Sequence, residues 1–76
     1  MVFEKVVEVI ADITGKNPDG ITMESHLVDD LDLDSLDAVE IVMALEDEYS
    51  VSVPDDDMEQ FKTVGDIVEY VEKMLD

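Results

Sequence analysis

The segment DSLDAVEIVMALEDEY, residues 34–49, has the spacing of an α-helix with two apolar faces. At about 100° per residue, one face is expected to pack on a core and holds Ala38, Ile41, Val42, Leu45 and Tyr49. A second face lies roughly 140° away and holds Leu36, Val39 and Met43. Aspartate and serine are both favoured N-cap residues, so either Asp34 or Ser35 begins this helix, which we expect to continue through Tyr49.

The second apolar face allows two interpretations. A central helix in a small bundle could bury both faces. Alternatively, the strip of Leu36, Val39 and Met43 stays exposed as a docking surface, because an apolar centre supplies contact area and methionine adapts to varied partners. The acidic rim of this strip would steer basic partners into register, and it consists of Glu40, Asp47 and, at its edge, Glu46. Because the strip begins one residue after Ser35, a partner bound there would have this serine within reach.

On the N-terminal side, apolar spacing predicts a helix over residues 2–14, and Gly15 provides a natural stop. The sequence KNPDG, residues 16–20, has the composition of a turn. Residues 21–33 contain apolar side chains without a sustained helical period, so we expect a long ordered loop that some of them pin to the core. Loops of this length in a compact domain are often functional.

On the C-terminal side, SVSVP at residues 50–54 closes the helix, and DDDMEQF at residues 55–61 predicts one or two further helical turns. Thr63 and Asp66 form a T-x-x-D capping pattern before a strongly amphipathic segment, which we expect to form the last helix. No strand is expected. The pattern therefore predicts an all-α fold, a small four-helix bundle with three principal helices, one short third helix and a long loop between helices one and two.

The length and the residue types restrict the class of protein. A chain of 76 residues corresponds to a single domain, residues 1–76, with a small core. The absence of cysteine excludes disulfides, thiolate zinc sites and a catalytic thiol of the chain's own, and it is typical of a cytoplasmic protein. The sequence has no signal peptide and no apolar run of about 20 residues, so no membrane span is expected.

The charge is strongly acidic and unevenly distributed. Four Lys and Arg residues oppose 22 Asp and Glu residues, which gives a net charge of −18. No basic residue lies between residues 17 and 61, where 15 of the acids are found. Such a field repels nucleic acids and anionic membranes and favours basic partners. Disordered chains also have high charge, but 46% hydrophobic residues with clear periods favour a folded domain of marginal stability.

Ser35 is flanked by carboxylates, which makes it a poor nucleophile for hydrolysis. A hydrolytic serine needs a base within reach, whereas the only histidine is His26 in the expected loop. A calcium loop fits no better, because an EF-hand that starts at Asp30 requires glycine at Ser35 and glutamate at Ile41. Two compatible roles for Ser35 remain, a helix N-cap and a passive acceptor that another enzyme modifies.

Three stretches, DSLD at residues 34–37, VE at residues 39–40 and MALEDEY at residues 43–49, resemble the acyl carrier proteins of bacterial type II fatty acid synthesis. The resemblance extends over essentially the whole chain, including V-P-D before the short third helix and T-V before the last. It implies a carrier, not an enzyme, in which a phosphopantetheinyl transferase attaches a 4′-phosphopantetheine arm from coenzyme A to Ser35. The arm's thiol would hold growing acyl chains as thioesters, so the reactive sulfur arrives with the arm.

The resemblance also implies two groups of binding residues in a cytoplasmic monomer without a specific metal site. The recognition helix of the family, which would contact the transferase and basic-surfaced fatty acid synthesis enzymes, corresponds to Asp34, Leu36, Asp37, Val39, Glu40, Met43, Glu46 and Asp47. A dynamic apolar pocket for the acyl chain lies largely between the second and third helices in the family, and its candidates here are Val28, Leu45, Val53, Met58, Phe61 and Tyr70. Each of these six is equally expected in an ordinary core.

Two departures from the family pattern bear on the cargo and the partners. The family commonly has Gly-Ala before D-S-L, where this chain has Asp32 and Leu33, and the region of the third helix contains the bulky Met58 and Phe61. A specialised carrier for a polyketide, lipopeptide or aminoacyl pathway is therefore the alternative within the family. An unmodified acidic interaction protein is the alternative from another class, and modification of Ser35 distinguishes it from a carrier.

Overall fold

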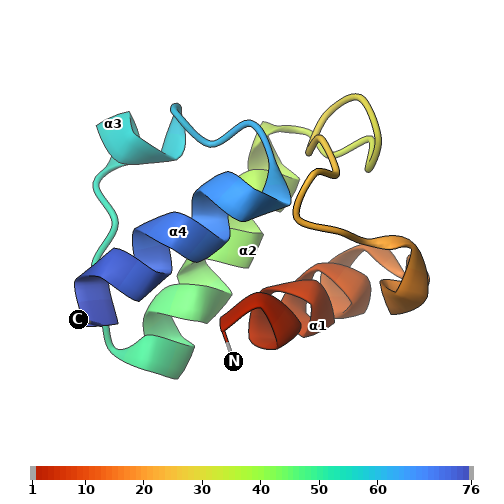
Figure 1. Cartoon of the computed structure of the whole chain (residues 1–76). Coiled ribbons are helices and arrows are strands. Elements are labelled where there is room, and N and C mark those ends of the chain that lie inside the picture. The colour runs from red at the N-terminus through yellow and green to blue at the C-terminus, as the bar shows by residue number, and fades with distance from the viewer. Residues whose placement is uncertain (1, 76) are drawn as a thin grey trace.

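The computed structural model describes residues 2–75, which form four α-helices joined by ordered connections (Figure 1). The helices are α1 (Val2–Thr14), α2 (Ser35–Tyr49), α3 (Asp55–Met58) and α4 (Val64–Leu75), and a short 3-10 helix spans Pro18–Gly20. α1 packs against both α2 and α4, and α3 contacts α2. The all-α class, the short third helix and the long loop are confirmed. Across residues 2–75, no helix combines the length and the apolar character needed to cross a bilayer.

The helix ends follow local signals in the sequence. α1 is followed by Gly15 with a φ of 76°, a left-handed conformation that glycine adopts without strain. α4 begins with a reciprocal pair, in which the Thr63 hydroxyl accepts a hydrogen bond from the Asp66 amide at 3.2 Å and the Asp66 carboxylate accepts one from the Thr63 amide at 3.1 Å. The predicted T-x-x-D cap is thereby confirmed. Ser50, the C-cap residue of α2, also has a left-handed conformation, with a φ of 55°.

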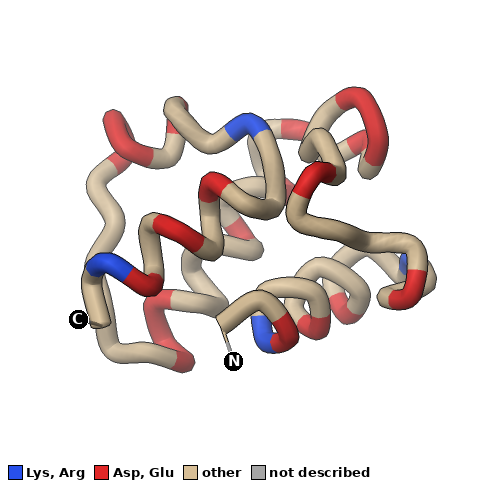
Figure 2. The backbone as a smooth tube through the Cα atoms, in the orientation of Figure 1, with Lys and Arg blue, Asp and Glu red and all other residues tan. Residues whose placement is uncertain are grey.

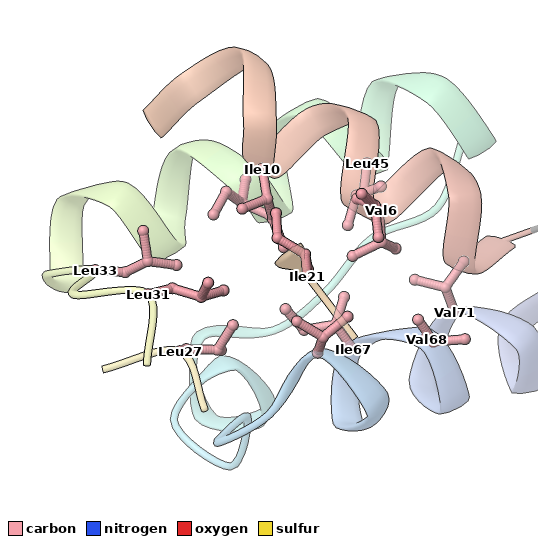
Figure 3. Close-up of a cluster of buried hydrophobic side chains, with 13 residues drawn as sticks. Val6, Ile10, Ile21, Leu27, Leu31, Leu33, Leu45, Ile67, Val68 and Val71 are labelled. Carbon is pink, nitrogen blue, oxygen red and sulfur yellow. The ribbon is translucent and has the colours of Figure 1, made fainter. Parts of the chain in front are cut away.

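The core lies where α1, α2, α4 and the long loop meet (Figure 3). The largest fully buried side chains come from the three principal helices and are Val6, Ile10, Ile41, Leu45, Val64 and Val71. Burying a side chain of this kind stabilises the fold by about 1.5–3 kcal/mol relative to leaving it in water. The core face predicted for α2 is confirmed at Ile41, Val42 and Leu45, which are all buried.

The loop between α1 and α2, residues 21–34, is held to the bundle by selected apolar side chains. Its buried members are Ile21, Leu27, Leu31 and Leu33. Two other apolar side chains of the loop point to solvent, because Met23 is 39% exposed and Val28 is 60% exposed. The expected pinning of an ordered loop by some of its apolar residues is therefore confirmed.

Backbone hydrogen bonds fasten this loop to the start of α4. The Leu27 amide donates to the Lys62 carbonyl at 2.9 Å, and the Gly65 amide donates to the Met23 carbonyl at 2.8 Å. A Cβ atom on Gly65 would lie 3.0 Å from the Met23 carbonyl oxygen, so the close approach favours glycine and a larger residue would need a small shift of the Met23 backbone. These contacts fix the path of the loop at Met23 and Leu27.

Candidate functional site

The start of α2 is a capping box that does not use the serine. The Asp34 carboxylate accepts a hydrogen bond from the Asp37 amide at 2.9 Å, and the Asp37 carboxylate accepts one from the Asp34 amide at 3.3 Å. Of the two candidate caps, Asp34 is therefore the N-cap, and Ser35 is the first residue of the helix. Ser35 is exposed on the first turn of α2.

His26 has a structural role in the loop. Its Nδ1 atom accepts hydrogen bonds from the Val28 amide at 3.3 Å and the Asp29 amide at 3.2 Å. The backbone amide of His26 donates to the Asp30 carboxylate at 2.7 Å. The imidazole and the neighbouring acid thus organise the tight turn that leads into the last part of the loop.

The apolar strip on α2 is exposed, so the interpretation in which the helix buries both of its faces is wrong. Leu36 is 73% exposed, Met43 is 57% exposed and Val39 is 39% exposed. Glu40 and Asp47 on the rim are also exposed. The geometry that places an apolar strip inside an acidic rim, next to Ser35, is therefore present on the surface of the protein.

Glu46 lies at the edge of this rim and also makes a hydrogen bond that helical geometry did not predict. Its Oε2 atom accepts a hydrogen bond from the Val53 amide at 2.7 Å, and the side chain is partly buried. The bond spans the connection between α2 and α3, in which Ser50 has its left-handed conformation. Glu46 therefore holds the segment that leads from α2 to α3.

Two grooves flank Ser35. The first has a volume of about 430 Å³, and its apolar lining is formed by Leu27, Val28, Leu33, Ala38, Met58 and Phe61. The second has a volume of about 370 Å³ and shares Ser35, Ala38, Met58 and Glu59 with the first. Because Met58 and Glu59 line both grooves, the C-terminal end of α3 lies at the boundary between them.

The residues expected to form an acyl pocket fall into two sets. Val28, Met58 and Phe61 come together in the first groove. Leu45 and Val53 are buried and line neither of the two grooves. The groove therefore lies nearer to the surface than a pocket built around Leu45 would.

The sequence did not predict three apolar lining residues of the first groove, Leu27, Leu33 and Ala38, nor the polar lining residue Glu59. Ala38 could have been found from spacing, because it follows Ser35 by three residues and so lies on the same side of the helix. Leu27 and Leu33 belong to a loop without a period, so no sequence pattern assigned them to the groove.

Tyr70, the remaining pocket candidate, fastens α3 to α4. Its hydroxyl donates to the Asp57 carboxylate at 2.5 Å, and its ring packs edge-on against Phe61 with centroids 5.2 Å apart. The hydrogen bond to Asp57 is the main cause that raises the pKa of the Tyr70 hydroxyl, and partial desolvation raises it further. Tyr70 therefore supports the first groove from behind Phe61 and does not line it.

Asp and Glu positions recur along all four helices, whereas Lys positions are few, as Figure 2 shows. Lys5 on α1 lies 3.5 Å from the Glu8 carboxylate and 3.7 Å from the Glu48 carboxylate of α2. The charges of Glu48 and then Glu8 raise the pKa of Lys5. Within the part of the chain that the structure describes, no three acidic or histidine side chains are placed to hold a metal ion.

Comparisons with known proteins give a consistent result. A family model described as a phosphopantetheine attachment site matches residues 4–71. The chain is 58% identical over 69 residues to an acyl carrier protein of Clostridium perfringens, with 91% of each chain covered. It is 51% identical to an acyl carrier protein of Clostridium acetobutylicum, covering 93% of this chain and 92% of that protein.

Comparison with a solved structure also indicates an acyl carrier protein. A solved structure of a Mycobacterium tuberculosis protein assigned as an acyl carrier protein superposes with a TM-score of 0.91 at 34% identity, covering 97% of this chain and 99% of that one. The family model, the identities and the helical arrangement agree over nearly all of the chain, so this protein belongs to the acyl carrier proteins, the phosphopantetheine-bearing carriers of acyl groups.

Proposed function

We propose that Ser35 is the residue to which 4′-phosphopantetheine is attached, within one carrier domain that spans residues 1–76. The observation that carries the proposal is that Asp34 makes the N-cap, which leaves the exposed Ser35 hydroxyl without a structural task in the capping box. Attachment through the Ser35 oxygen would therefore leave the cap intact. When bound, the group supplies a thiol that holds acyl chains as thioesters.

The residues around Ser35 suit an attached arm and its cargo. Ser35 is one of the lining residues of the first groove, and most of the others are apolar. An apolar chain that enters it leaves water, and each buried methylene contributes about 0.8 kcal/mol. Val28, Met58 and Phe61 are the cargo contacts that both the family resemblance and this groove support.

The partners that we propose are a phosphopantetheinyl transferase and enzymes with basic surfaces. The strip of Leu36, Val39 and Met43 is exposed beside Ser35 and supplies apolar contact area. The carboxylates of the rim and of the cap would steer basic partners toward that strip, and they belong to Asp34, Asp37, Glu40, Glu46 and Asp47. The protein itself would act as a carrier and monomer, with catalysis left to its partners.

We propose fatty acid synthesis in the cytoplasm as the pathway. The absence of cysteine supports the location, and the acyl carrier proteins named above support the pathway. A specialised carrier is the second candidate, because Leu33 replaces the small residue common before D-S-L and lines the groove beside Ser35. The two candidates differ in the acyl groups that partner enzymes would load.

Intact mass measurement tests the attachment. The purified protein is incubated with coenzyme A, magnesium and a broad-specificity phosphopantetheinyl transferase, beside Ser35→Ala and Ser52→Ala variants. Ser52 is a matched control because it is also exposed but follows α2. The proposal predicts addition of one phosphopantetheine to the parent and to Ser52→Ala, and none to Ser35→Ala.

Two results would refute the proposal. Addition to Ser35→Ala would place the arm on another residue. Failure of several transferases to modify a protein that circular dichroism shows to be helical would favour the unmodified acidic interaction protein.

A further inference from the structure

Two leucines separate the first groove from the core. Leu27 and Leu33 are both members of the buried core cluster and also line the first groove. Each is 5% exposed. The Leu33 amide donates a hydrogen bond to the Leu27 carbonyl at 3.0 Å, which ties the two residues together. One side of this leucine wall therefore faces the groove, and the other side packs on the core.

Leu33 is the part of the wall nearest to Ser35 along the chain. Only the N-cap Asp34 lies between them, and the capping box fixes the backbone at this point. Figure 3 shows Leu33 beside Leu31 at the edge of the core cluster where α2 begins. Leu31 is 4% exposed and belongs to the same cluster, but it does not line the groove.

We propose that Leu33 limits the length of the acyl chain that this protein can shelter, because its side chain closes the groove toward the core. The inference rests on the proposed function for the nature of the cargo and adds the residue that sets its size. A chain longer than the groove would leave its end in water, since the wall prevents it from reaching the core. Replacing Leu33 by alanine removes three carbon atoms, so the groove should accept about three more carbons of the cargo.

The lack of cysteine permits a test that needs no prosthetic group. A Ser35→Cys variant has a single thiol, which can be modified with straight-chain alkyl methanethiosulfonates from butyl to hexadecyl. The Cys sulfur forms a disulfide with the alkylthio group, and methanesulfinate leaves. The thermal unfolding midpoint of each product then measures how much of the alkyl chain the protein buries. The series is repeated with Leu33→Ala and, as the matched core control, with Leu31→Ala.

In the Ser35→Cys background, we expect the unfolding midpoint to rise with alkyl length and then reach a plateau. Leu33→Ala should move that plateau to chains about three carbons longer, whereas Leu31→Ala should lower all midpoints and leave the plateau in place. If Leu33→Ala does not fold, Leu33→Val and Leu31→Val replace the pair, and the expected shift is about one carbon.

Three outcomes would overturn the inference. The plateau could stay in place when Leu33 is shortened, it could move equally when Leu31 is shortened, or no alkyl length could stabilise the protein. None of these outcomes bears on attachment of phosphopantetheine, which the mass measurement decides separately. Conversely, a failed attachment would leave the alkyl series as a direct measure of the groove.

Discussion

The hydrogen bond from the Val53 amide to Glu46 gives the clearest test of how α3 is held in place. Glu46 lies at the edge of the acidic rim on α2, and Val53 is buried in the connection to α3. Glu46→Ala removes the acceptor and leaves the Val53 amide, in a residue only 8% exposed, without this partner. We expect the α2–α3 connection to loosen and the whole domain to lose stability.

The size of the effect follows from two opposing contributions. A hydrogen bond to a charged acceptor contributes about 1.5–3 kcal/mol, and partial exposure of Glu46 places this one near the lower end. Removing one negative charge from a protein with a net charge of −18 relieves repulsion and returns about 0.5 kcal/mol. The net loss is about 1 kcal/mol, which lowers the unfolding midpoint of a domain of this size by about 4–8 °C.

Asp47→Ala is the matched control for this prediction, because it removes the same charge from an exposed neighbour. Urea unfolding followed by circular dichroism gives the free energy of unfolding of both variants and the parent. Amide hydrogen exchange at Val53 reports the local effect, which should be faster in Glu46→Ala only. Equal stability of the Glu46→Ala and Asp47→Ala variants, with unchanged exchange at Val53, would show that Glu46 does not hold the α2–α3 connection.

Three further results are expected. Ser50→Gly should stabilise the protein by about 0.5–1 kcal/mol, because Ser50 has a φ of 55° that glycine adopts without strain. Thermal unfolding measures the effect, and an unfolding midpoint below that of the parent would contradict this expectation. Met43→Ala should slow acyl transfer to partner enzymes while leaving the free energy of unfolding within about 0.5 kcal/mol of the parent, because Met43 is 57% exposed. Unchanged transfer kinetics would contradict the docking assignment. Hydrogen bonds from the Lys62 and Thr63 amides lower the pKa of Asp66 below its ordinary 3.8, so its stabilisation is complete above that pH and is lost as the pH falls through the lowered value. Asp66→Asn should therefore be less stable than the parent at pH 7, and the gap measured by urea unfolding should close in acid; a gap independent of pH would exclude this role.

Helical periods predicted the fold because each principal helix buries one face against the others. The ends of α1 and α4 were predictable as well, since Gly15 and the pair of Thr63 and Asp66 act on their own neighbours. The choice between Asp34 and Ser35 as the N-cap was not predictable, because both residue types suit that position and the capping box with Asp37 decides between them.

The candidate site was predictable where it depends on a helix and less so elsewhere. A period of about 100° per residue places Leu36, Val39 and Met43 on one face of α2, whereas the exposure of that face had two interpretations until the fold was known. The burial of Leu33 and the exposure of Val28 depend on how an irregular loop folds over the core. The bond between Glu46 and Val53 depends on the path of the connection after α2, which no repeating pattern encodes.

The loop before α2 is fastened to α4 by main-chain groups, which affects how freely its sequence can drift during evolution. Bonds such as those from Leu27 to Lys62 and from Gly65 to Met23 use amides and carbonyls that every non-proline residue supplies. Outward-facing side chains of the loop that make no hydrogen bond to its backbone, unlike His26 and Asp30, can therefore be exchanged without moving Ser35. Gly65 in α4 is more constrained, because a Cβ there would crowd the Met23 carbonyl oxygen at 3.0 Å, so relatives that keep this loop path should favour a small residue at that position while the loop surface diverges.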